Sequence, residues 1–91
     1  MKNLINGTVS DTVHALIQNM KSVINTNSSI LKDDPSRYDL RSESFDLRIW
    51  IDQMEYHLSK QKSNGSYPKY DLSCLRNIAS RFVPKYLPEC A

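Results

Sequence analysis

The segment from Phe45 to Lys62 constrains the fold most, because its apolar side chains fall on two sides of a helix. Residues spaced three or four apart share one side of a helix with 3.6 residues per turn. Five apolar residues share one side and predict the core-facing stripe: Leu47, Trp50, Ile51, Met54 and Leu58. Phe45, Ile49 and Tyr56 fall on nearly the opposite side. A helix that is apolar on two sides needs partners on two sides.

Two further amphipathic segments flank this one and predict an all-α protein. Residues 9–27 place their apolar side chains on a single arc, and residues 72–83 repeat the pattern. The central helix is expected over about residues 44–62, with Ser42 or Ser44 as its N-cap, because a serine oxygen accepts one of the first free amide hydrogens. No segment shows the sustained alternation that is typical of a strand. The sequence therefore predicts a small three-helix bundle.

Proline and glycine residues place the boundaries between the helices. Pro35 interrupts the chain after the first helix, with room for a short additional helical turn between helices 1 and 2. Gly65 suits a left-handed C-terminal cap on the central helix, and Pro68 delays the next helix. Pro84 should end the third helix, since proline has no amide hydrogen to donate. Residues 84–91 are then expected to form an extended tail that lays side chains on the bundle.

Length and composition indicate one domain without a membrane segment. The chain has 91 residues, of which 40% are hydrophobic and 24% charged, and its net charge is +2. Acidic residues dominate the middle of the chain and basic residues its last third, so the charge distribution is dipolar. The start of the chain shows neither a secretory signal nor an apolar span, which predicts a cytoplasmic protein. Low alanine usage together with frequent Asn, Ser and Lys suggests an AT-rich coding source, such as a bacterial mobile element.

Histidine and cysteine are the residues that could carry chemistry. His14, His57, Cys74 and Cys90 lack the close pairs with which structural zinc sites are built, so no metal is expected. Cys74 would lie at a helix N-terminus, but no base stands near it in sequence. In the cytoplasm both thiols would be reduced, although a disulfide between them would close only a short loop. The histidines fall on or near polar faces, where solvation is expected. The sequence therefore predicts no enzyme, cofactor or small-molecule substrate.

The second apolar side of the central helix leads to a functional prediction. Other parts of the chain could cover it, and the candidates are Ile30, Leu31, Tyr38 and Leu40. Alternatively, it contacts another protein or a second copy. In that case the expected binding residues are Tyr38, Phe45, Ile49, Asp52 and Tyr56. The protein would then be an adaptor, inhibitor or assembly factor.

The basic end of the chain supports an alternative from a different class. Six basic residues are interleaved with tyrosines in this region: Lys60, Lys62, Lys69, Arg76, Arg81 and Lys85. Such a composition could bind phosphates and stack bases. The break between the second and third helices is too long for a helix-turn-helix motif. The alternative prediction is a small nucleic-acid-binding regulator.

Overall fold

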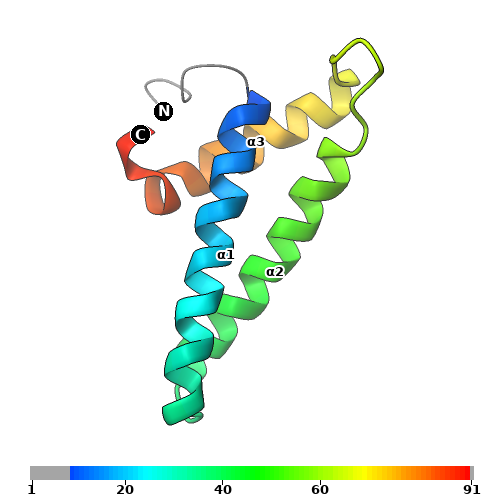
Figure 1. Cartoon of the computed structure of the whole chain (residues 1–91). Helices are drawn as coiled ribbons and strands as arrows, with labels where there is room; N and C mark the ends of the chain where they lie inside the picture. Colours follow the sequence, from blue (N-terminus) through cyan, green and yellow to red (C-terminus); the bar gives the residue numbers. More distant parts are fainter. Residues whose placement is uncertain (1–8, 91) are drawn as a thin grey trace.

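Three helices make up most of the computed structural model, which describes residues 9–90. They are α1 (Val9–Asp33), α2 (Tyr38–Leu58) and α3 (Lys69–Tyr86), followed by a short 3-10 helix, η1 (Pro88–Cys90). Helices α1 and α2 run antiparallel from a tight connection and diverge, and α3 crosses the end where they lie farther apart (Figure 1). No strand occurs in residues 9–90. The prediction of an all-α three-helix bundle is confirmed.

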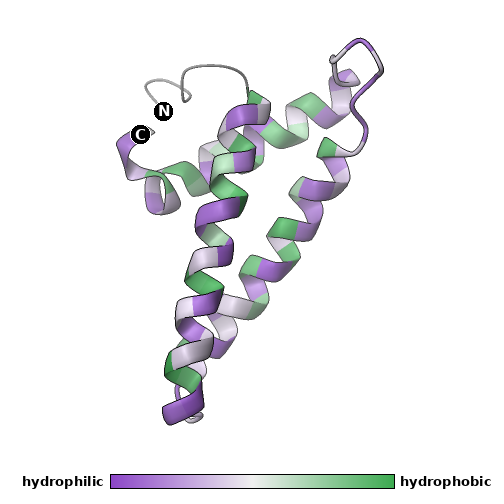
Figure 2. Cartoon of the chain, in the orientation of Figure 1, coloured by the Kyte–Doolittle hydropathy of each residue, from purple (hydrophilic) through white to green (hydrophobic). Residues whose placement is uncertain are grey.

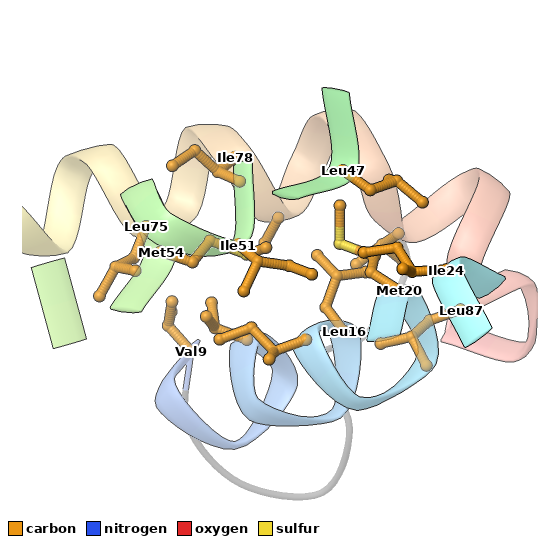
Figure 3. Close-up of a cluster of buried hydrophobic side chains, with 14 residues drawn as sticks. Val9, Leu16, Met20, Ile24, Leu47, Ile51, Met54, Leu75, Ile78 and Leu87 are labelled. Carbon is orange, nitrogen blue, oxygen red and sulfur yellow. The ribbon is translucent and has the colours of Figure 1, made fainter. Parts of the chain in front are cut away.

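The core lies where all three helices meet. Each helix contributes one apolar stripe, and Leu16, Met20, Met54 and Leu75 are completely closed to solvent. Figure 3 shows these side chains converging from the three helices, with Leu87 closing one end. All three helices carry both apolar and polar residues along their whole length (Figure 2), as expected for helices that are each covered on one side. The overall dimensions of 47 × 25 × 16 Å leave the joined ends of α1 and α2 extending beyond α3.

Helix α1 is longer than predicted. It continues past Asn27 to Asp33. An asparagine side chain tends to compete for local backbone hydrogen bonds, which is why the helix was predicted to end here. The Asn27 side chain is instead buried and donates to Glu43 Oε1 (2.9 Å) and Ser44 Oγ (3.2 Å) on α2. This contact removes the competition that would have ended the helix.

Helix α2 begins at Tyr38 and ends at Leu58, whereas residues 44–62 were predicted. Ser44 is therefore no N-cap but a buried residue inside the helix. Asp39 provides the acidic first turn that suits the helix dipole. The additional helical turn expected between helices 1 and 2 is the first turn of α2 itself, and the connection is only 34–37. There the Asp34 carboxylate accepts hydrogen bonds from Ser36 N and Oγ, as in an Asx turn.

Helix α3 begins at Lys69 and runs to Tyr86, so both predicted ends are wrong. Pro68 precedes its first residue, where a missing amide hydrogen costs nothing. Pro84 lies inside the helix and is exposed. The fixed φ of proline is close to the helical value. Beyond Pro84, Leu87 N donates to Val83 O at 2.8 Å, which is again the hydrogen bond of an α-helix. The predicted extended tail is wrong, because residues 84–86 belong to α3 and residues 88–90 form η1. Leu87 and Tyr86 nevertheless pack on the bundle as expected, Leu87 being buried and Tyr86 lying against the core.

Gly65 has the predicted left-handed backbone, but in a turn beyond α2 and not at its C-terminus. Its φ is 88°, its amide donates to Lys62 O at 2.9 Å, and its carbonyl accepts from Gln61 Nε2. We expect Gly65→Ala to lower the free energy of unfolding by about 1 kcal/mol, because a Cβ disfavours this φ. The nearest atom to an added Cβ would be 4.0 Å away, so no clash contributes. Urea unfolding measures the effect. Gly65→Asn should lower the free energy of unfolding by less than Gly65→Ala does. Equal losses of stability in the two variants would contradict a backbone origin of the effect.

Candidate interaction surface

The side of α2 that faces away from α1 and α3 carries four large apolar side chains. We call Tyr38, Phe45, Ile49 and Tyr56 the outer stripe. Their spacings of 7, 4 and 7 residues place all of them on one line along the helix. Their exposed fractions are 70%, 54%, 45% and 56%, in that order. Within the described residues 9–90, no other segment covers this side of α2.

Charged residues frame the outer stripe. The Arg41 guanidinium lies 5.8 Å from the centre of the Tyr38 ring, and Lys60 Nζ lies 4.6 Å from the centre of the Tyr56 ring. Both distances are within the range of a cation–π contact. Asp52, one of the expected binding residues, is exposed beside the stripe. The two tyrosines at the ends are therefore held against cations, while Phe45 and Ile49 form an uncharged centre.

The Arg37–Asp39 pair lies at the start of α2, close to one end of the outer stripe. The Arg37 guanidinium donates to both oxygens of Asp39, at 3.1 and 2.9 Å. These hydrogen bonds lower the pKa of the Asp39 carboxyl below its ordinary value. Asp39 therefore remains ionised at neutral pH and reinforces the helix dipole at this end.

The edge of α2 that faces α3 is held there by a pair of side chains that the sequence analysis did not predict. His57 and Asp71 are both buried, and His57 Nδ1 lies 2.8 Å from Asp71 Oδ1. The expectation that His57 is solvated is wrong, because α3 covers this side of α2. Farther along the same edge the Trp50 ring packs against the Phe82 ring in a tilted arrangement, with ring centres 5.1 Å apart, and the Arg81 guanidinium lies 4.9 Å from the Trp50 ring.

Glu43 links all three helices. One carboxylate oxygen accepts from Asn27 of α1, and the other accepts from the Tyr86 hydroxyl of α3 at 3.3 Å and lies 3.7 Å from Lys85 Nζ. Burial, together with the nearby Glu43 carboxylate, raises the pKa of Tyr86. A cavity of about 450 Å³ lies beside this cluster, with acidic side chains from α2 and basic ones from α3. Of its charged lining residues, Glu43 and Lys85 pair with each other, and Glu43 joins the three helices.

Cys74 lies in a second groove between α2 and α3. The groove has a volume of about 330 Å³, and its lining includes His57, Tyr70 and Trp50. Cys74 is a free, half-buried thiol, and its hydrogen bond raises the pKa of Tyr70. In this groove His57 Nδ1 already has a partner, the Asp71 carboxylate.

The predicted alternative of a disulfide between Cys74 and Cys90 involves the Cys90 side chain, which lies outside the described side chains. Within residues 9–90 no three His, Cys, Asp or Glu residues are placed to hold a metal ion.

The chain matches no protein-family model, no curated protein and no solved structure. None of the helices between residues 9 and 90 is long and apolar enough to cross a membrane.

The six basic residues of the alternative prediction do not share one surface. Arg81 and Lys85 lie one turn apart on the side of α3 that faces α2, where they contact Trp50 and Glu43. Lys69 and Arg76 lie about 140° around the same helix. Lys60 and Lys62 belong to the connection before α3. Nucleic-acid binding stays a prediction, and the acidic residues that line the 450 Å³ cavity beside Arg81 and Lys85 do not favour it.

The structure brings together all five residues of the predicted protein-binding site. Tyr38 extends the outer stripe by two turns because α2 starts earlier than the sequence indicated. Sequence reasoning missed the His57–Asp71 pair and the Glu43 cluster, since their partners are 14 or more residues away in the chain. No local pattern signals such contacts. Tyr70, one of the tyrosines interleaved with the basic residues of the alternative prediction, is exposed and lies beside His57.

Proposed function

We propose that this protein acts by contact with another protein chain, without catalysis, and that the outer stripe of α2 is its contact surface. The observation that carries the proposal is the exposure of Tyr38, Phe45, Ile49 and Tyr56 on one line of the helix. Single exposed apolar residues are common on protein surfaces, but four large ones on one line of a helix are typical of a binding site.

The intramolecular explanation has little support in the arrangement of the helices. Ile30 and Leu31, which could have covered the outer stripe, lie at the end of α1; Ile30 is itself exposed and Leu31 half-buried. Leu40 is also half-buried. With these residues in place, every member of the outer stripe still exposes close to half of its surface or more. Aromatic side chains are preferred anchors in protein interfaces, and three of the four members are aromatic.

Ile49→Glu tests the proposal at the centre of the outer stripe. We expect association through this surface to weaken at least about 10-fold, because a carboxylate would have to lose its hydration in the middle of the contact. The helix should remain folded, since Ile49 is half-exposed and glutamate is a good helix former. Light scattering after size-exclusion chromatography measures self-association. Quantitative affinity capture from an extract of the native host measures binding to other proteins.

Gln18→Glu is the matched control. It adds the same charge on the exposed side of α1, away from the outer stripe, and should leave both measurements unchanged. Circular dichroism establishes that both variants are folded. If folded Ile49→Glu protein self-associates and captures partners as the wild type does, the outer stripe is not a contact surface.

A further inference from the structure

We infer that the outer stripe is covered by the outer stripe of a second copy, with the two α2 helices packed antiparallel about a two-fold axis. This inference rests on the proposed function, because it names the partner of the same surface. Three observations support it: the spacing of the apolar residues, the order of the charges beside them and the area that they expose.

The spacing of the outer stripe is the same in both directions. The intervals of 7, 4 and 7 residues make position 47 the midpoint of the pair Tyr38 and Tyr56 and of the pair Phe45 and Ile49. A two-fold contact requires that if residue i meets residue j of the partner, j also meets i. In an antiparallel arrangement centred on position 47, each Phe45 meets an Ile49, and each Tyr38 meets a Tyr56. The first and last members are five helical turns apart, about 27 Å, so the line runs straight along the helix.

Arg41, on one edge of the outer stripe, also meets acidic residues in this arrangement, whereas Arg48 lies one residue from the axis and therefore beside Arg48 of the second copy. On the edge next to α1, Arg41 and Arg48 precede Asp52 and Glu55, and all four are exposed. Lys21 of α1, 3.4 Å from Glu55, identifies this edge. In an antiparallel two-fold contact each edge meets the same edge of its partner, running in the opposite direction. Arg41 then lies level with Asp52 and Glu55 of the second copy, and the same pairing repeats on the other side of the axis.

The exposed area is that of a small but specific interface. Each aromatic side chain can bury roughly 150–250 Å², so half-exposed members of the outer stripe contribute about 100 Å² each. Two stripes then supply about 800 Å², and the flanking Arg41 and Asp52 side chains bring the total to about 1,000 Å². This is near the lower limit for a specific contact. The dimer should therefore dissociate on dilution.

Cysteine cross-linking tests both the partner and the direction. In a background with Cys74→Ser and Cys90→Ser, Tyr38→Cys and Tyr56→Cys are prepared as separate proteins. Mixed under mild oxidation, they should form a disulfide-linked dimer, seen as a band of twice the monomer mass on a non-reducing gel. Each protein alone should form much less. The mixed dimer retains an intact Tyr38–Tyr56 contact at its other end, which favours the productive arrangement.

The outcomes separate this inference from the proposed function. Cross-linking of Tyr38→Cys alone as strongly as in the mixture would indicate a parallel pair and overturn the antiparallel arrangement. A wild-type protein that stays monomeric across the concentration series in sedimentation velocity would overturn the second copy as partner. If Ile49→Glu still abolished capture of host proteins, the proposed function would stand with a different occupant. A concentration-dependent dimer that Arg41→Glu weakens, and that Asp52→Arg added to Arg41→Glu restores, would confirm the charge pairing.

Discussion

Leu16→Ala is expected to lower the free energy of unfolding by about 3 to 4 kcal/mol. Leu16 is completely closed to solvent and lies where side chains from the three helices converge (Figure 3). The substitution removes apolar contacts and leaves a cavity that packed helices can fill only in part. Small domains are stable by only about 5–15 kcal/mol, so this loss is a large share of the total. The melting temperature should fall by more than about 10 °C.

Ile49→Ala is the control for that prediction, because it shortens a side chain of the outer stripe that no other segment of residues 9–90 covers. Its effect on stability should be small, since Ile49 is half-exposed and alanine favours a helix. Both variants are compared by urea unfolding followed by circular dichroism, at a protein concentration low enough to exclude self-association. Equal losses in the two variants would mean that the outer stripe belongs to the core.

Periodicity alone located the three helices because each has one side buried in a common core. Leu47, Ile51 and Met54 were assigned to the core from their spacing, and all three are buried. The same reasoning placed Phe45, Ile49 and Tyr56 on the opposite side, where the structure shows them exposed. Helical phase depends only on local geometry, which explains why it could be derived from sequence.

The ends of the helices could not be derived in this way, because contacts between helices decide them. Asn27 continues α1 since its side chain finds partners on α2. Ser44 is accommodated inside α2 because its hydroxyl accepts the hydrogen bond from Asn27. Pro84 is tolerated within α3 near its end, on an exposed position. Each of these residues disfavours a helix interior by itself, and a tertiary contact or solvent access reversed the outcome.

The buried pair between α2 and α3 leads to the second large effect. We expect Asp71→Ala to lower the free energy of unfolding by about 2 to 3 kcal/mol, because it leaves the His57 ring nitrogen without a partner in a site nearly closed to water. The two side chains expose only 9% and 11% of their surfaces, and their polar atoms are 2.8 Å apart. This bond joins the end of α2 to the first turn of α3 across the connection of residues 59–68. Asp71→Asn, which keeps an oxygen at the same place, should lower the free energy of unfolding by less than Asp71→Ala does.

Asp39→Ala is the matched control, since Asp39 is also an acidic residue in the first turn of a helix and is also paired with a basic side chain. Its partner Arg37 lies 2.9 Å away, but the two side chains expose 64% and 45% of their surfaces. Water can replace the lost partner there, so stability should change only slightly. Urea unfolding of both variants, with a double-mutant cycle that adds His57→Ala to Asp71→Ala, measures the difference. If Asp39→Ala cost as much as Asp71→Ala, the helix dipole and not the burial of His57 would explain the effect, because the dipole is the term that both carboxylates share.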